Sequence, residues 1–324
     1  MKKEHIDQIN KAIEEVKKRD IKSIYFVACG GSQAVLMPGK YMMDRNTDLI
    51  SQVYTANEFV YDAPKSLGKN SIVISISHSG TTPETVNATK LGREKGAITI
   101  SFSHADESPL WQATEFPIHY DWGTDADASD LNKPVVYGLA FKLLEHFTGD
   151  KKWAVCFDEL NKLQDLTVKV KKDHAKSAEK WGQSYKRSAN IYTIGSGINY
   201  GEVYSTAMCW FMEMQWINSA AINSGEYFHG PFEVTDYDVP FILVKSIGNT
   251  RHLDERVEKF AKQHTKCLEV LDQADLPLDD VKPEAKEFIA AILSGVVIRQ
   301  MVEAIAYERG HSLDVRRYMW HLDY

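Results

Sequence analysis

The stretch IYFVACGGS, residues 24–32, predicts a β-strand that ends in a glycine turn. Its first four residues are β-branched or aromatic, which favours a buried strand, and Gly30 and Gly31 end the apolar run. Residues 34–43 are expected to form the helix that follows. This order of strand, glycine turn and helix predicts an α/β unit.

The same order recurs in the second half of the chain. Residues 191–194 (IYTI) lead into Gly195-Ser196-Gly197, and residues 201–217 are expected to form the helix. The offset from Ile24 to Ile191 is 191 minus 24, or 167 positions. The second half therefore contains a candidate copy of the first unit.

A second pair of motifs supports the duplication. Residues 72–82 (IVISISHSGTT) have a counterpart in residues 241–250 (FILVKSIGNT), and the offset from Gly80 to Gly248 is 248 minus 80, or 168. Two motif pairs at nearly the same offset predict two related halves, because chance similarity would not preserve the distance between them.

Each half alternates strand and helix patterns, as in the expected helix 83–95 before the expected strand 97–102. This alternation predicts parallel sheets with helices on both faces. A long helix over residues 160–181 is expected to link the halves. We predict a first domain of residues 1–155, which includes an N-terminal helix, and a second domain of residues 156–324.

Composition excludes several classes of function. The apolar fraction of 44% and charged fraction of 26% are typical of a globular protein, and the net charge of -7 argues against nucleic acid as a partner. Residues 1–20 predict an amphipathic helix rather than a signal peptide. The longest apolar stretch, residues 288–298, is shorter than the roughly 18 residues of a membrane span. We therefore expect a cytoplasmic protein without a membrane segment.

Cofactor and metal motifs are not apparent in the sequence. Cys29, Cys156, Cys209 and Cys267 form no CxxC pair, which is typical of a reducing compartment and makes structural zinc unexpected. Cys29 lies in the glycine turn and could be either a nucleophile or an inert thiol. The inert thiol is the favoured interpretation. The turn lacks the GxGxxG dinucleotide pattern, and no Walker loop is present. We expect no cofactor and no metal.

The loop Ser77-His78-Ser79-Gly80-Thr81-Thr82 predicts a phosphate site. Pro83 suits the first position of a helix and Thr82 its N-cap, so hydroxyl groups and free backbone N–H groups would meet at a helix N-terminus. A capped helix with a Ser/Thr turn is the structural alternative. Because the counterpart loop 245–250 loses most of the hydroxyls, we expect one such site, with Ser32 as a further ligand.

Two candidates for acid and base chemistry lie in the second half. Glu213 is the carboxylate in the most apolar part of the expected helix 201–217, where it could act as a general base, although an outward face shared with Glu202 is the alternative. His229 precedes Gly-Pro in a polar loop and could open a sugar ring, or it could be structural. Glu226 could orient His229 or support an interface.

Three motifs resemble the double sugar-isomerase (SIS) family: ACGGS at 28–32, SHSGTT at 77–82, and Glu213 placed 229 minus 213, or 16, positions before His229. The resemblance spans most of the chain. It extends to the isomerase half of glucosamine-6-phosphate synthases and, in chain length and the tail Arg316-Arg317-Tyr318, more closely to fructoselysine-6-phosphate deglycases. It implies two tandem SIS domains, each a flavodoxin-like three-layer sandwich.

The resemblance also implies roles for particular residues. Glu213 would be the carbon base and His229 the ring-opening group, and a homodimer or higher homo-oligomer would place His229 in a neighbour's site. Glu226, His311, Arg316 and Arg317 would contact the substrate or support the site. The implied phosphate or substrate ligands are Gly30, Gly31, Ser32, Ser77, His78, Ser79 and Thr82.

The resemblance predicts a metal-independent deglycase. It would hydrolyse a phosphorylated Amadori-type sugar-amino acid, such as fructoselysine 6-phosphate, to a hexose 6-phosphate and a free amino acid. A glucosamine-6-phosphate synthase is not expected, because the sequence lacks the glutaminase domain of these enzymes. It also lacks their lysine near the C-terminus, since the chain ends in His321-Leu-Asp-Tyr324. An aldose–ketose phosphate isomerase, an aminosugar-phosphate deaminase and a sugar-phosphate-binding regulator stay open as alternatives.

Overall fold

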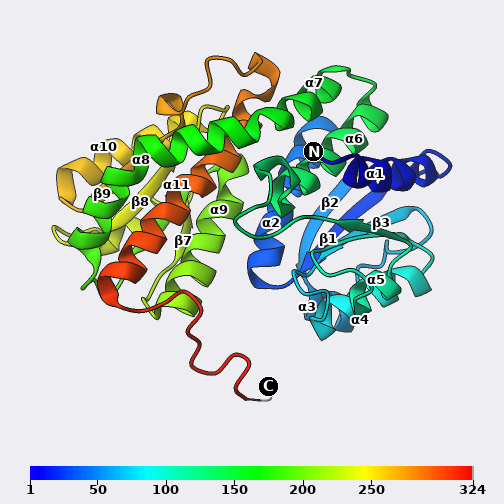
Figure 1. Ribbon diagram of the computed structural model, residues 1–324, viewed down its shortest axis with the longest axis horizontal. Helices are drawn as coiled ribbons and strands as arrows, with labels where there is room; N and C mark the ends of the chain where they lie inside the picture. The colour runs from blue at the N-terminus through cyan, green and yellow to red at the C-terminus, as the bar shows by residue number, and fades with distance from the viewer. Residues whose placement is uncertain (323–324) are drawn as a thin grey trace. The chain divides into compact units, whose positions relative to one another are not determined.

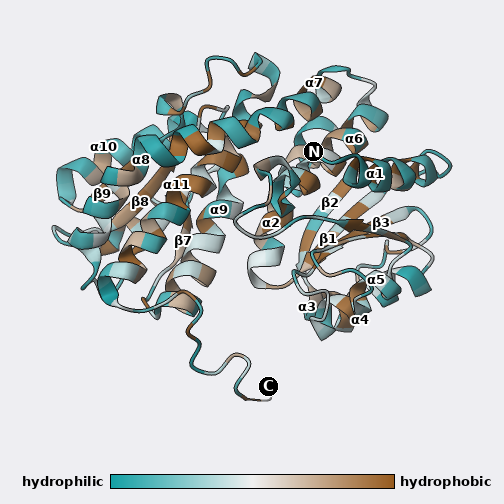
Figure 2. Ribbon diagram, viewed as in Figure 1, coloured by the Kyte–Doolittle hydropathy of each residue, from teal (hydrophilic) through white to brown (hydrophobic). Residues whose placement is uncertain are grey.

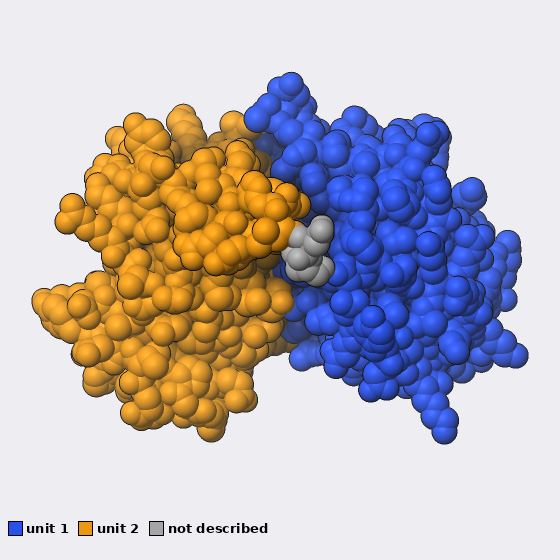
Figure 3. Space-filling view, turned by 90° about the horizontal axis from the view of Figure 1, so that it is seen from below, with its two compact units in different colours: residues 1–164, 282–285 blue, residues 165–281, 286–324 orange. Residues whose placement is uncertain are grey.

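The computed structural model describes residues 1–322 and belongs to the α/β class, as predicted. Contacts divide the chain into two compact units: unit 1 comprises residues 1–164 with 282–285, and unit 2 comprises 165–281 with 286–324 (Figure 3). The domain boundary predicted at residues 155 and 156 falls inside α7 (Lys152–Glu159), whereas the contacts divide the chain between Gln164 and Asp165. Helix α7 therefore belongs with unit 1.

Unit 1 contains a parallel five-stranded sheet of order β2-β1-β3-β4-β5. Strands β1, β3 and β4 are buried along their whole length, which explains their continuous apolar sequences. The strands are β1 (Ser23–Ala28), β2 (Ile50–Thr55), β3 (Ser71–Ile76), β4 (Ile98–Ser103) and β5 (Phe116–His119).

Helices cover both faces of this sheet (Figure 1). On one face, Tyr25, Val27 and Val73 of the strands pack with Phe59 and Ala88 of two helices into a buried core. One face carries α1 (Lys3–Val16), α2 (Gly30–Asn46) and α6 (Asn132–Thr148), and the other carries α3 (Ala56–Tyr61), α4 (Pro83–Glu94) and α5 (Pro109–Ala113). Short 3-10 helices follow at Ala128–Asp130 and Leu160–Lys162.

Unit 2 repeats the topology in a parallel four-stranded sheet of order β7-β6-β8-β9. The order equals β2-β1-β3-β4 of unit 1, which confirms the predicted duplication. The strands are β6 (Tyr192–Gly195), β7 (Ala221–Asn223), β8 (Phe241–Lys245) and β9 (Leu268–Asp272), and the helices are α8 (Leu163–Tyr185), α9 (Tyr200–Ser205), α10 (Arg251–His264) and α11 (Lys286–Arg309). Short 3-10 helices of unit 2 lie at Gly197–Asn199, Pro231–Val234 and Gln273–Asp275, whereas the one at Pro283–Ala285 belongs to unit 1.

The longest apolar helical segment is longer than the stretch 288–298 that we identified in the sequence. The helical segment Pro283–Arg309 is long and apolar enough to cross a membrane by length and composition, unlike the shorter stretch 288–298 considered in the sequence. However, 67% of its most apolar window is buried inside the protein, and Figure 2 shows hydrophobic colour on much of α11 and on the strands. This is typical of the core helix of a globular domain.

Three helix boundaries differ from the sequence expectation. Helix α2 begins at Gly30 rather than Ala34, so Gly30, Gly31 and Ser32 form its first turn. The linking helix α8 spans Leu163–Tyr185 after a 3-10 turn. The expected helix 201–217 is divided into α9 and a π-helix over Thr206–Met214.

Candidate active site

The two predicted phosphate segments meet at the switch point of the unit 1 sheet. Strands β1 and β3 are parallel neighbours, and the chain continues from them toward opposite edges of the sheet. Ligands bind at such points, outside the carboxyl ends of the strands. The turn Gly30–Ser32 follows β1, the loop Ser77–Thr82 follows β3, and the Thr85 hydroxyl lies 4.0 Å from Cys29 Sγ between them.

The hydroxyl groups of the Ser77–Thr82 loop are paired with one another. Ser77 Oγ lies 2.8 Å from Thr82 Oγ1, and Ser79 Oγ lies 2.6 Å from Thr81 Oγ1. Thr82 and Pro83 occupy the N-cap and first turn of α4 as predicted, but the Thr82 side chain makes no capping hydrogen bond. The expected side-chain cap is therefore wrong, and the N-terminal N–H groups of α4 are left for another acceptor.

The loop conformation depends on Gly80. Its φ is +67°, and a Cβ at this position would lie 2.0 Å from Ser108 Oγ, so a side chain does not fit. The Leu110 N–H donates to the Gly80 carbonyl at 2.9 Å, which anchors the loop to α5. The loop is therefore held by neighbouring backbone rather than by its own hydroxyl groups.

His78 lies at the surface of this loop with one side of its ring covered. Its Nδ1 lies 3.0 Å from the Tyr120 hydroxyl, and its ring stacks on His104 at a centroid distance of 5.4 Å. Partial burial, and to a lesser extent His104, lower the pKa of His78. His78 is therefore neutral at pH 7 and offers hydrogen bonds rather than a fixed charge.

Glu213 lies in the π-helix of unit 2. The side chain is 25% exposed, which contradicts the expectation of a carboxylate enclosed by apolar residues. Its Oε1 accepts a hydrogen bond from Arg316 Nε at 2.9 Å and lies 2.8 Å from Arg316 Nη2. π-helical segments are rare and often mark functional sites. The geometry gives a carboxyl group with one oxygen bound by Arg316 and the other available.

The C-terminal tail supplies the surroundings of Glu213. The chain leaves α11 at Gly310, whose φ is +61°, and the His311 ring meets the Trp216 ring edge-on at 4.5 Å. The guanidinium of Arg317 lies 4.3 Å from the centre of the Trp216 ring. The structure thus brings His311, Arg316 and Arg317 to the end of the π-helix, a proximity that no sequence pattern predicts.

Trp216 is a site residue that sequence reasoning missed. It is 40% exposed and has a φ of +54°, an unusual value for a residue with a side chain. Strained backbone of this kind costs of order 1–3 kcal/mol and is concentrated at functional sites. The sequence signal that could have identified it is a tryptophan three positions after the carboxylate of an apolar segment.

His229 and Glu226 lie in an exposed turn after β7. The His229 N–H donates to the Glu226 carbonyl at 2.9 Å, and Gly230 follows with a φ of +130°. Within residues 1–322, no hydrogen bond or ion pair joins the side chain of His229 to that of Glu213 or Glu226. The structure therefore presents His229 to solvent, and its predicted place in a neighbouring subunit's site stays a prediction.

Comparisons with known proteins identify the fold and the family. Residues 18–128 match the SIS domain. The chain is 41% identical over 318 residues to fructosamine deglycase FrlB of Bacillus subtilis, covering 98% of this chain and 97% of the relative. The chain belongs to the SIS-domain family that includes this deglycase.

Two further comparisons agree with this SIS-family assignment. Fructoselysine 6-phosphate deglycase of Escherichia coli is 29% identical, and the match covers 96% of this chain and 89% of the relative. The crystal structure of a putative phosphosugar isomerase from Bacillus subtilis superposes with a TM-score of 0.96 at 40% identity, covering 98% and 97% of the two chains. The similarity therefore extends through both SIS domains.

In the second SIS domain, a side-chain carboxyl group binds the donors of the loop that corresponds to the phosphate loop. Asp254 is fully buried, and its Oδ1 accepts hydrogen bonds from Ser196 Oγ at 2.7 Å and Ser224 Oγ at 2.6 Å. Its Oδ2 accepts from the Ser246 N–H at 2.9 Å. Burial raises the pKa of Asp254, and these hydrogen bonds oppose the rise. Donors after β6 and β8 are thus already occupied by an internal anion.

A second carboxylate lies against the same loop. A Cβ on Gly248 would lie 2.1 Å from Glu287 Oε1, and burial raises the pKa of Glu287. The two side chains occupy the donors and the space beside this loop that a phosphate group would need. This arrangement supports the sequence expectation that only the first SIS domain carries a phosphate loop.

Replacing Asp254 by alanine should destabilise the protein. The change leaves the Ser196 and Ser224 hydroxyls and the Ser246 N–H buried without their acceptor, at roughly 3–5 kcal/mol in all. Urea unfolding would measure the loss. Glu255→Ala is the matched control on the same helix, because Glu255 is 52% exposed and should change stability by less than about 0.5 kcal/mol. Equal effects of both changes would contradict the structural role of Asp254.

Proposed function

We propose that this protein is a cytoplasmic deglycase that hydrolyses phosphorylated Amadori compounds. Its substrates would be fructosamine 6-phosphates, in which a ketose 6-phosphate carries an amino acid through nitrogen at C1. Its products would be a hexose 6-phosphate and the free amino acid. The observation that carries the proposal is the similarity, over nearly the whole chain, to the fructosamine deglycase of Bacillus subtilis. The relative from Escherichia coli is named for fructoselysine 6-phosphate, which suggests that substrate first.

In the proposed mechanism, Glu213 transfers a proton between two carbon atoms. After His229 assists ring opening, the Glu213 carboxylate removes a proton from C1, and the C2 carbonyl becomes the hydroxyl of an enaminol. Return of the proton to C2 gives a Schiff base between C1 and the amine, and water then hydrolyses the C1–N bond. The hydrogen bond from Arg316 holds one oxygen of Glu213 in place and leaves the other for the proton transfer.

The phosphate group is assigned to the switch point of unit 1. We propose that the hydroxyls of Ser77, Ser79 and Thr82 exchange their mutual hydrogen bonds for bonds to the phosphate oxygens, joined by Ser32 and the N–H groups at the start of α4. His78, Gly30 and Gly31 line the same edge. His311, Arg317 and Glu226 are proposed as supporting residues.

Substrate assays would test this function directly. The purified protein is incubated with fructoselysine 6-phosphate, with other fructosamine 6-phosphates and with their unphosphorylated forms, and the released amino acid is measured. We expect much faster release from phosphorylated fructosamines than from their unphosphorylated forms. Interconversion of hexose phosphates, or ammonia release from glucosamine 6-phosphate, would favour the isomerase or deaminase alternative. Tight binding without turnover of any of them would favour a regulator.

A mixing experiment would test the proposed homodimer and its shared sites. If His229 completes the site of the neighbouring subunit, Glu213→Gln and His229→Asn subunits should complement each other. Random exchange gives about half heterodimers with about one intact site each, so about a quarter of wild-type activity should return. The control mixes Glu213→Gln with a variant carrying both substitutions, which should stay inactive. Proven subunit exchange without recovery would show that each subunit uses its own pair.

A further inference from the structure

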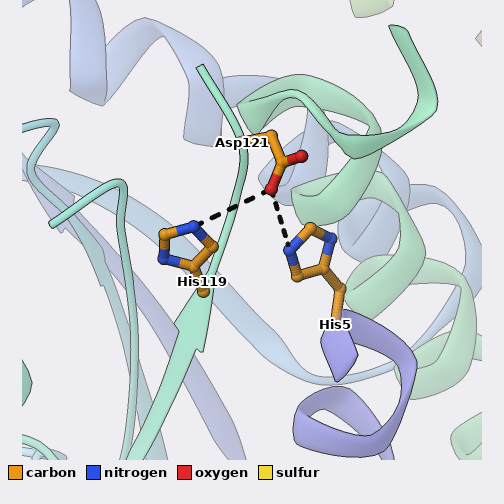
Figure 4. A group of neighbouring side chains, drawn as sticks. All are labelled: His5, His119 and Asp121. Atoms are coloured by element: carbon orange, nitrogen blue, oxygen red, sulfur yellow. Dashed lines mark ion pairs between the residues drawn. The ribbon is translucent and has the colours of Figure 1, made fainter. Parts of the chain in front are cut away.

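Three side chains with metal-ligand chemistry meet in unit 1 (Figure 4), where the His104 ring lies between His119 of this cluster and His78 of the phosphate loop. His5 comes from α1, His119 is the last residue of β5, and Asp121 follows two residues later. His5 Nε2 lies 3.5 Å and His119 Nε2 lies 3.8 Å from Asp121 Oδ1. Each residue offers one ligand atom, and the three atoms lie within 4.8 Å of one another.

His5 contributes an unpartnered nitrogen to this cluster. Its side chain is fully buried, and its Nε2 makes no hydrogen bond although it faces the carboxylate of Asp121. Its Nδ1 lies 3.2 Å from Asp130 Oδ1, and a carboxylate only accepts, so the Nδ1 atom carries the proton. The Nε2 lone pair therefore points into the cluster. Buried polar atoms without a partner are rare and call for an explanation.

His119 also has a carboxylate beside its second ring nitrogen, although no hydrogen bond joins them. Its Nδ1 lies 2.9 Å from Asp106 Oδ1, on the opposite side of the ring from Asp121. Histidine ligands of metals almost always place their second nitrogen against a carboxylate or carbonyl group, which fixes the ring and leaves the other lone pair for the metal. His5 has this arrangement through Asp130, whereas a small rotation of the exposed Asp106 side chain would give His119 the same partner.

We propose that His5 Nε2, His119 Nε2 and Asp121 Oδ1 bind a divalent first-row transition-metal ion, with zinc as the best fit. A tetrahedral zinc ion with bonds of 2.0–2.1 Å holds its ligand atoms about 3.3 Å apart, so small ring and carboxylate movements would complete the site. His119 and Asp121 are each 17% exposed, which lets water supply the fourth ligand and lets the ion enter. Two imidazole nitrogens favour zinc over magnesium.

The proposed ion would fasten the start of the chain to the edge of the sheet. His5 lies 119 minus 5, or 114, positions before His119, so the ion would close a long loop. The Lys2 ammonium group pairs with the other oxygen of Asp121, but it is 56% exposed and can move into solvent. The role is structural and independent of the proton transfer proposed for Glu213.

Metal titration of the chelator-treated protein would test the site. Zinc is measured by competition with a chromophoric chelator, and cobalt by the visible absorption of a tetrahedral complex. Wild type should bind one ion per chain and should melt at a higher temperature with zinc than without it. His119→Ala should lose both the zinc binding and the zinc-dependent rise in melting temperature. In the presence of chelator it should melt at the same temperature as wild type. Asp130→Asn should weaken zinc binding by about 10–100-fold, because a neutral amide in place of the carboxylate weakens the hydrogen bond that orients His5.

Controls separate this site from adventitious binding. The variant His252→Ala/His264→Ala removes two exposed histidines of unit 2 and should bind zinc like wild type. His5→Ala could fail to fold because His5 is fully buried, so the partly exposed His119 carries the test. The proposal is overturned if wild type binds no zinc, if it binds magnesium equally well, or if His119→Ala retains wild-type zinc affinity.

Discussion

Glu213→Gln is expected to lower kcat by about 10²–10⁴-fold with little change in KM, the usual contribution of a general base. Glutamine keeps the size of the side chain and its hydrogen-bonding capacity but cannot remove a proton. The variant should also stop exchanging the C1 protons of the substrate with D₂O. Steady-state release of the amino acid gives kcat, and proton NMR of the unreacted substrate gives the exchange.

The ion pair with Arg316 requires a matched control. Arg316 is 6% exposed, so Glu213→Gln also leaves a nearly buried cation without its partner and could lower stability. Arg316→Gln breaks the same pair but retains the carboxylate, so its loss of kcat should be smaller than that of Glu213→Gln. Thermal unfolding of both variants separates the stability effect from the chemical one.

A near-normal rate for Glu213→Gln would leave Glu213 as a structural residue of the π-helix. Glu226 would then be the next candidate, because it lies three positions before His229 in the exposed turn. Glu226→Gln should be measured in the same assay. A loss of D₂O exchange in Glu226→Gln and not in Glu213→Gln would transfer the role of carbon base between them.

The parts of the fold that could be predicted are those with local signals. Buried parallel strands require continuous apolar runs, so residues 24–28 and 72–76 were recognisable as β1 and β3. Gly80 was identifiable because the turn after β3 needs a positive φ. The offset of 168 positions from Gly80 to Gly248 nearly equals the offset of 167 positions from Ile24 to Ile191, and this agreement predicted the repeated topology.

The π-helix was not predictable, although the helix around Glu213 was. Residues 207–212 (AMCWFM) are apolar on every side, so they carry no periodicity that distinguishes a π-helix from an α-helix. The pairing of Glu213 with Arg316 joins residues 103 positions apart, and no sequence pattern encodes that contact. The expectation of an enclosed carboxylate failed for this reason.

Contacts between residues far apart in the chain explain why the Asp254 network and the His5–His119 cluster were not predicted. Asp254 looks like an ordinary acidic residue of an amphipathic helix, and only folding places it among Ser196, Ser224 and Ser246. His5 belongs to a highly charged N-terminal helix, and its partner His119 lies at the end of β5. Ligand spacing was the sequence test for a metal site, and spacing detects only ligands that are close in the chain.

The double variant Ser79→Ala/Thr82→Ala is expected to lower kcat/KM for the phosphorylated substrate by about 10²–10⁴-fold. Hydrogen bonds to a charged group contribute about 1.5–3 kcal/mol each, so two of them account for a loss of this size, mainly as a rise in KM. Since the Thr82 hydroxyl does not cap α4, its removal should cost only its hydrogen bond to Ser77, about 0.5–1.5 kcal/mol of stability.

The unphosphorylated fructosamine distinguishes loss of phosphate binding from general damage. Wild type should prefer the phosphorylated substrate strongly, and the double variant should lose that preference while its kcat/KM for the unphosphorylated substrate stays unchanged. Thr250→Ala is the matched control, because Thr250 is the counterpart of Thr82 in the loop where Asp254 already occupies the donors. It should leave KM unchanged. If Ser79→Ala/Thr82→Ala keeps both the preference and a normal KM, the phosphate is bound elsewhere.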